Sequence, residues 1–236
     1  MNNITISESI GRGFQEIFDL ENSPTTMKEL QSMILKSHQQ KNLERTTLAW
    51  IAWHYIEHNF FPSSEIISRE LHIDLPLVHK TLEALESKGI LTVGENKEIT
   101  GAYGVSSQPT WHSFYLDHKP IHVWCAIDSL GIPLVLNKHT TVHSKCSHCK
   151  FGIDIKIEGG ALGQHDQNIV VFVGFRGDVL EKVSEDFCPY INFFCSDKHL
   201  ESWKTKNPSV KGMGLDLQTA SEISKNIFLP LGSTLR

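Results

Sequence analysis

The sequence has no long uninterrupted apolar run, and its first residues lack the features of an export signal. Met1–Thr5 carries no basic cluster, and no apolar segment of the signal-peptide type follows it. No apolar run approaches the length of about 20 residues that a helix needs to cross a bilayer. These absences predict a cytoplasmic protein that has no membrane partner.

The sequence also has no excess of positive charge. Its 22 Lys and Arg residues are outnumbered by 27 Asp and Glu residues, and the formal net charge is -5. A protein with this balance has no general electrostatic attraction to nucleic acid or to anionic lipid. We therefore expect a partner that is not a polyanion, which excludes nucleic acid.

Cysteine is absent from the first 124 residues, and an odd number of cysteines follows. The five cysteines are Cys125, Cys146, Cys149, Cys188 and Cys195. An odd count in a chain without an export signal argues against a framework of disulfides. The sequence therefore predicts thiols that are free for chemistry or for metal binding.

Cys146 and Cys149 have the Cys-x-x-Cys spacing of half a tetrahedral zinc site. A complete site needs two more ligands. The candidate pairs are Cys188 with Cys195 and His143 with His148. The first of these pairs is spaced more widely than structural zinc sites usually are. A redox role of the thioredoxin kind is disfavoured, because the motif lies between expected strands. Structural zinc stays open at this point.

The first hundred residues predict a set of helices followed by a hairpin. Apolar periodicity and capping residues predict helices at 10–18, 27–37, 42–60, 63–71 and 75–88. Two short strands, 90–93 and 97–100, then flank a turn. Helix, turn, helix and a two-stranded wing is the order of a winged-helix module.

The charge of this expected module disfavours DNA binding. From Phe60 to Thr100, four basic residues stand against seven acidic ones. The expected recognition helix, Pro76 to Lys88, balances its two lysines with Glu83 and Glu86 and contains no arginine. It offers few phosphate contacts and no arginine for guanine. We expect the module to have a structural or docking role.

From about residue 101 the pattern changes to strands. Strand-like segments occur at 114–116, 121–124, 140–142, 152–157 and 168–173, and helices are expected at 196–204 and 216–226. The sequence therefore predicts an α+β fold in two parts. Residues 1–100 form the N-terminal helical winged-helix-like module, and residues 101–236 form a mixed, largely antiparallel β domain with flanking helices.

Cys125 and Asp128 are three residues apart within an apolar segment. In a helix this spacing puts the thiol and the carboxyl on one face, whereas in a strand it separates them. A thiolate is a soft nucleophile, and a carboxyl in apolar surroundings can carry a proton at neutral pH. The pair is therefore a candidate for attack on a soft electrophile. A buried cysteine beside a capping aspartate is the alternative.

Several segments of the second half resemble the organomercurial (alkylmercury) lyase family. In chain order they are Ala102-Tyr103-Gly104, Trp124-Cys125-Ala126-Ile127-Asp128, Ser144-Lys145-Cys146, Phe187-Cys188, Ile191-Asn192-Phe193-Phe194 and Trp203. The resemblance covers about residues 101 to 228. That family also begins with a winged-helix-like module that does not bind DNA.

The resemblance implies an enzyme that cleaves carbon–mercury bonds by protonolysis, giving a hydrocarbon and Hg(II) in mercury detoxification. The family's two cysteines and aspartate correspond here to Cys125, Cys188 and Asp128, which become the expected catalytic and mercury-binding residues. No cofactor is expected. Mercury is bound as substrate and product, and cytosolic thiols or mercuric reductase accept the Hg(II).

The sequence departs from the family pattern at three positions. Pro189 stands where some members carry a second adjacent cysteine, and Cys149 and Cys195 have no counterpart. Cys146 resembles a family cysteine that has a structural role. Two alternatives therefore stay open, namely a cysteine-based metal-responsive winged-helix regulator and a catalytically silent relative that binds metal.

Overall fold

The computed structural model describes residues 42–176 and 182–234. The helices expected at 10–18 and 27–37 lie outside these ranges. Within them, helices and antiparallel strands are mixed, and the α+β class predicted from the sequence is confirmed. None of the helices in the described ranges is both long and apolar enough to cross a bilayer.

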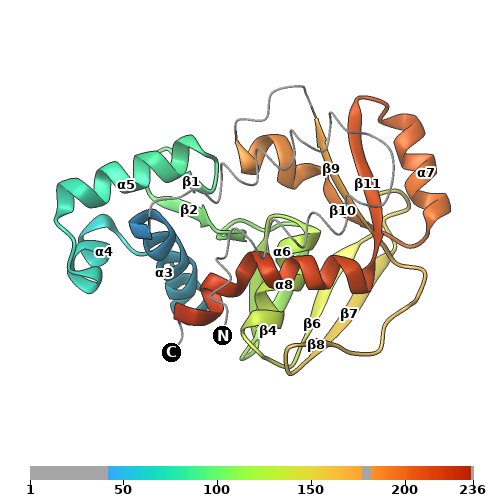
Figure 1. Cartoon of the computed structure of the whole chain (residues 1–236), viewed down its shortest axis with the longest axis horizontal. Coiled ribbons are helices and arrows are strands. Elements are labelled where there is room, and N and C mark those ends of the chain that lie inside the picture. The colour runs from blue at the N-terminus through green and yellow to red at the C-terminus, as the bar shows by residue number, and fades with distance from the viewer. Residues whose placement is uncertain (1–41, 177–181, 235–236) are drawn as a thin grey trace, which may run out of the picture.

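Three helices gather at one end of the molecule, as expected (Figure 1). They are α3 (Asn42–His58), α4 (Ser64–Leu71) and α5 (Leu75–Ser87). The side chain of Ser63 caps α4 by accepting a hydrogen bond from the Ile66 N–H at 3.4 Å. After α5, Gly89 adopts φ +64°, a conformation that favours glycine and ends the helix.

An eight-stranded antiparallel sheet runs from the helical end into the second half of the chain. Its strand order is β1-β2-β3-β5-β4-β6-β7-β8. The strands are β1 (Leu91–Val93), β2 (Ile99–Ala102), β3 (Val105–Ser106), β4 (His112–Leu116), β5 (Lys119–Val123), β6 (Thr140–Lys145), β7 (Gly152–Glu158) and β8 (Ala161–Leu162). The expected hairpin is thus β1–β2, and it continues through β3 into the remaining strands. The winged-helix assignment and the boundary at residue 100 stay predictions.

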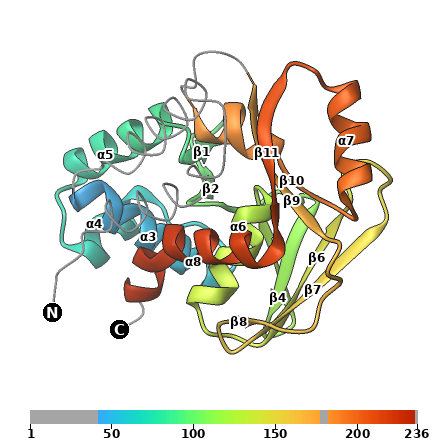
Figure 2. The ribbon, with the colours of Figure 1, turned by 45° about the vertical axis from the view of Figure 1, so that its right-hand side comes forward.

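A second sheet and three helices complete the described structure. The sheet has the antiparallel order β10-β9-β11. Its strands are β9 (Val170–Arg176), β10 (Ile191–Phe194) and β11 (Val210–Asp216), and the helices are α6 (Ala126–Val135), α7 (Asp197–Lys206) and α8 (Leu217–Thr234). In Figures 1 and 2 α8 runs alongside α6 and ends beside α3. The last helix therefore connects the helical end to the rest of the fold.

The contact between α6 and α8 depends on a glycine. A Cβ atom placed on Gly131 of α6 would overlap the Phe228 ring and lie 2.6 Å from the Ser224 carbonyl oxygen, both in α8. Only a residue without a side chain lets these helices approach so closely. Because Cys125 is the N-cap residue directly before α6, this packing also fixes the position of that thiol.

We expect Gly131→Ala to destabilise the protein by about 1–3 kcal/mol, because the new methyl group must push α8 away. Gly152→Ala is the matched control, since a Cβ at Gly152 would meet nothing within 4 Å. Urea unfolding of both variants measures the difference. Equal stability of the two variants would contradict this account of the helix contact.

Candidate active site

Cys125 lies at the N-cap position of α6, directly after β5 and Trp124. Its backbone is extended, with φ −148° and ψ 176°. The Cys125 N–H donates a hydrogen bond to Asp128 Oδ2 at 3.0 Å, and the Cys125 sulfur faces the backbone of Asp128 in return. This is a capping box in which a thiol replaces the usual hydroxyl. Asp128 thus closes the helix end and holds its carboxyl beside the thiol.

Cys188 lies in a short irregular segment before β10. The segment consists of the π-helix η1 (Val183–Phe187) and the 3-10 helix η2 (Cys188–Tyr190). The N–H groups of Val183 and Ser184 donate to the carbonyls of Lys88 and Gly89, at 3.2 and 3.0 Å. A Cβ on Gly89 would lie 2.7 Å from Lys182 Cβ. The turn after α5 therefore positions the segment that carries Cys188.

The structure brings Cys125, Asp128 and Cys188 together, although Cys188 lies 63 residues after Cys125 in the chain. The two sulfurs and a carboxylate oxygen all lie within 4.8 Å of one another. The three side chains are 1%, 7% and 5% exposed. One metal ion of the size of mercury can therefore contact all three without a rearrangement of the backbone.

Burial keeps this cluster close to neutral. Burial, the hydrogen bond with Cys188 and the charge of Asp128 raise the pKa of Cys125 well above its usual value. Burial also raises the pKa of Asp128 to about 7. The hydrogen bond with Cys125 lowers the pKa of Cys188, but burial and Asp128 outweigh it, so this pKa is raised too. The site thus holds protons that an arriving cation can displace.

A two-residue turn covers the carboxyl of Asp128. Tyr103 and Gly104 join β2 to β3 with φ of 50° and 87°, the pattern of a type I′ hairpin turn. A Cβ on Gly104 would lie 2.7 Å from Asp128 Cγ. The Tyr103 hydroxyl donates to the Ile227 carbonyl of α8 at 2.7 Å and anchors the turn. Glycine at this position lets the backbone shield the carboxyl from water.

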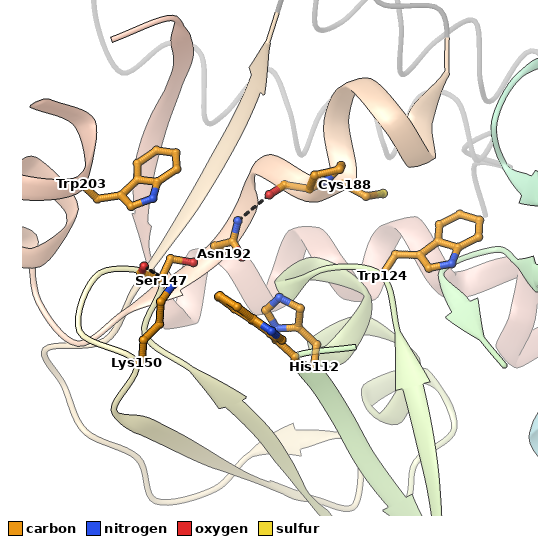
Figure 3. Close-up of a pocket in the computed structure, with 9 residues that line it drawn as sticks. His112, Trp124, Ser147, Lys150, Cys188, Asn192 and Trp203 are labelled. Carbon is orange, nitrogen blue, oxygen red and sulfur yellow. Dashed lines mark hydrogen bonds between the residues drawn. The ribbon is translucent and has the colours of Figure 1, made fainter. Parts of the chain in front are cut away.

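A pocket of about 320 Å³ opens beside Cys188 (Figure 3). The lining residues are Trp111, His112, Trp124, Ser147, Lys150, Cys188, Pro189, Asn192 and Trp203. Three tryptophans give the pocket aromatic walls suited to an apolar group. Cys188 is the member of the thiol and carboxyl cluster that lines it, so a ligand in the pocket meets Cys188 first.

Sequence reasoning did not single out His112, which lies buried at the pocket. Burial lowers the pKa of His112 to about 4, so its ring is neutral at physiological pH. Its Nδ1 lies 2.9 Å from the Ser144 hydroxyl of β6. No spacing in the sequence links these residues, because the pairing of β4 with β6 alone brings them together.

The remaining three cysteines form a second cluster that excludes Cys188. Cys146, Cys149 and Cys195 gather with His199, and their ligand atoms also lie within 4.8 Å of one another. The expectation that Cys188 or the pair His143 and His148 completes the Cys-x-x-Cys set is wrong. Sequence reasoning missed His199, although its place four residues after Cys195 was a usable signal.

The fold is mixed α+β, and it buries two thiols and a carboxyl beside an aromatic pocket. Such a site is suited to binding a soft, thiophilic electrophile. Comparison with known protein families shows which family of such proteins this chain belongs to. The family model described as alkylmercury lyase matches residues 105–229, more than half of the chain. The chain belongs to the alkylmercury lyase family.

Curated relatives agree with this assignment, and a solved structure shares the fold. The alkylmercury lyases of Bacillus cereus and Clostridium butyricum are each 26% identical over 148 residues, which is 63% of this chain and 65% of theirs. That of Staphylococcus epidermidis is 23% identical over 150 residues, 64% of this chain and 68% of its own. The crystal structure of the mercury-bound form of MerB2 has a TM-score of 0.75 at 20% identity, covers 86% of this chain and 99% of its own, and shares the fold.

The raised pKa of Asp128 makes a prediction about stability. Its pKa of about 7 in the folded protein exceeds the ordinary aspartate pKa of 3.8, so ionisation of Asp128 costs stability as pH rises from about 4 to 7. Asp128→Asn has no charge to bury and keeps an oxygen for the Cys125 N–H. The stability of this variant relative to the unsubstituted protein should therefore increase with pH, by about 4 kcal/mol at most.

Urea unfolding of both proteins at pH 5 and pH 8 measures this change, because the substitution removes the carboxyl whose pKa of about 7 lies between these two pH values. Asp117→Asn is the control, because Asp117 is exposed in the turn between β4 and β5, where its φ of 48° suits asparagine as well as aspartate. A stability difference for Asp128→Asn that does not change with pH would contradict a burial-raised pKa.

Proposed function

We propose that this protein is an organomercurial lyase, which cleaves the carbon–mercury bond by protonolysis and releases a hydrocarbon and Hg(II) in mercury detoxification. The observation that carries the proposal is the buried cluster of Cys125, Asp128 and Cys188, whose ligand atoms lie within 4.8 Å of one another. Membership of the alkylmercury lyase family supports it.

The first step is exchange of thiols on mercury. An organomercurial enters the pocket bound to a small thiol, with its organic group against the tryptophans. Cys188 lines the pocket, so its sulfur replaces the small thiol, and the Cys188 proton leaves with that thiol. The mercury stays Hg(II), with one bond to carbon and one to sulfur.

The second step moves one proton from sulfur to carbon. Contact with mercury acidifies the Cys125 thiol, whose proton passes to the neighbouring Asp128 carboxylate. Two thiolates on mercury push electron density onto the carbon, and Asp128 then donates the proton to it. The carbon–mercury bond breaks, its electron pair forms the new carbon–hydrogen bond, and Hg(II) remains between two sulfurs. Asp128 is again a carboxylate.

The pKa of Asp128, raised to about 7 by burial, suits this relay. A general acid works best when its pKa lies near the operating pH, because it then both accepts and releases the proton readily. No cofactor is needed in this scheme. External thiols remove the Hg(II), and we propose cytosolic thiols or mercuric reductase as the acceptors and the cytoplasm as the compartment.

We propose no DNA-binding role for the helical end. The exposed charged side chains of α5 are Lys80, Glu83 and Glu86, which give no positive surface for phosphates. The hydrogen bonds from Val183 and Ser184 to the turn after α5 favour a structural role instead. The charge of α5 and these hydrogen bonds weigh against a metal-responsive regulator that binds DNA.

Headspace methane from methylmercury and excess thiol tests the activity. We expect Cys125→Ala, Cys188→Ala and Asp128→Ala each to abolish methane release, because each removes a mercury ligand or the proton donor. Asp154→Asn is the control for loss of a surface carboxyl and should keep full activity. Release at the unsubstituted rate by any of the three variants would refute the role assigned to that residue.

The same assay separates a lyase from a silent relative. A purified chain that binds Hg(II) through Cys125 and Cys188 but releases no methane is a metal-binding relative and not an enzyme. Binding is measured separately by titration of free thiols against Hg(II), so the two outcomes are distinguishable.

A further inference from the structure

A second cluster of metal-ligand side chains lies outside the proposed catalytic site. Cys146 and Cys149 belong to the loop that joins β6 to β7, Cys195 directly follows β10, and His199 lies in the first turn of α7. The three sulfurs and a ring nitrogen of His199 all lie within 4.8 Å of one another. The four residues thus come from two segments about 50 residues apart.

The distances within this cluster match those of a tetrahedral zinc site. Cys149 Sγ lies 3.8 Å from Cys195 Sγ, and Cys146 Sγ lies 3.6 Å from His199 Nδ1. A regular tetrahedron with Zn–S of about 2.3 Å and Zn–N of about 2.0 Å has edges of about 3.8 Å between sulfurs and about 3.5 Å between sulfur and nitrogen. The ligands are therefore already spaced for one ion.

Backbone hydrogen bonds hold the loop that carries Cys146 in a tight conformation. The Cys146 N–H donates to the Phe151 carbonyl at 2.9 Å, and the Lys150 N–H donates to the Cys146 carbonyl at 2.8 Å, which closes a tight loop. These two hydrogen bonds hold Cys146 in a fixed position within the loop that also carries Cys149.

The geometry does not fit two other uses of these thiols. Cys149 and Cys195 are not bonded to each other, because their sulfurs lie 3.8 Å apart, whereas a disulfide holds them about 2.05 Å apart. Hg(II) is satisfied by two thiolates, as in the proposed catalytic pair. Four converging ligands with one imidazole are instead a donor set typical of zinc, and four protein ligands leave no position open for a substrate.

We propose that Cys146, Cys149, Cys195 and His199 form a structural zinc site. The ion would fix the β6–β7 loop to the junction of β10 and α7, where the Ser147 N–H already donates to the Phe193 carbonyl at 3.0 Å. Ser147 and Lys150 of the same loop line the pocket beside Cys188. The zinc would thus stabilise one wall of that pocket without taking part in the chemistry.

The metal content of the full chain tests this proposal. The protein is purified under reducing conditions without chelator, and zinc is measured by mass spectrometry. We expect one zinc per chain. Cobalt(II) added to the metal-free protein should give the intense visible bands of a tetrahedral site and sulfur-to-cobalt charge-transfer bands.

Variants assign the ligands. Cys149→Ser and His199→Ala should each lose the bound zinc and the tetrahedral cobalt spectrum. His148→Ala is the matched control, because its ring lies 5.1 Å from that of His199 but outside the ligand set. Cys125→Ala is the second control, since it removes a thiol of the other cluster. Both controls should keep one zinc per chain.

Three outcomes would overturn the proposal. They are a purified chain that holds no zinc and gives no tetrahedral cobalt spectrum, zinc that stays bound to Cys149→Ser and His199→Ala, and zinc lost equally from either control. Circular dichroism shows whether each variant is folded, and Cys149 is exposed, so its substitution disturbs no core packing. No organomercurial is used, so the result is independent of the proposed lyase activity.

Discussion

The rest of the site depends on the burial of the Asp128 carboxyl beside the thiols of Cys125 and Cys188. Water would stabilise the charged forms of all three groups, and its exclusion raises the pKa of each of them. The thiols and the carboxyl therefore tend to keep their protons, and a thiophilic cation that binds the sulfurs can displace the thiol protons. The Tyr103–Gly104 turn, the capping box at Cys125 and the segment that carries Cys188 all contribute to that exclusion.

The two halves of the chain depend on each other at this site. The hydrogen bonds from Val183 and Ser184 to the turn after α5 hold the segment of Cys188, while α8 packs against the helix that begins at Cys125 and also contacts α3. The N-terminal helices thus act as a support for the chemistry of the second half. The lack of a positive surface on α5, whose exposed charged side chains are Lys80, Glu83 and Glu86, is consistent with that role.

The five cysteines separate into two clusters with different chemistry. Two thiols with a carboxyl are suited to linear coordination of mercury and to proton transfer, whereas three thiols with an imidazole are suited to tetrahedral zinc. Both clusters lie close to the same pocket, one through Cys188 and the other through the loop of Ser147 and Lys150. Their different ligand sets would let one chain hold the proposed structural zinc while Cys125 and Cys188 stay free for the proposed chemistry.

The sequence by itself indicated many of the helices and strands and the local pair of Cys125 and Asp128, but it did not assign α6 or strands such as β10 and β11. Apolar periodicity and capping residues located α3 to α5 and the hairpin, and the three-residue spacing made Cys125 and Asp128 neighbours once the segment was helical. Local spacing cannot show which distant residues meet, because sheet pairing and helix packing bring them together. Only the tertiary structure therefore decided that Cys188 joins Cys125, that His199 completes the second cluster, and that His112 and the tryptophans form a pocket.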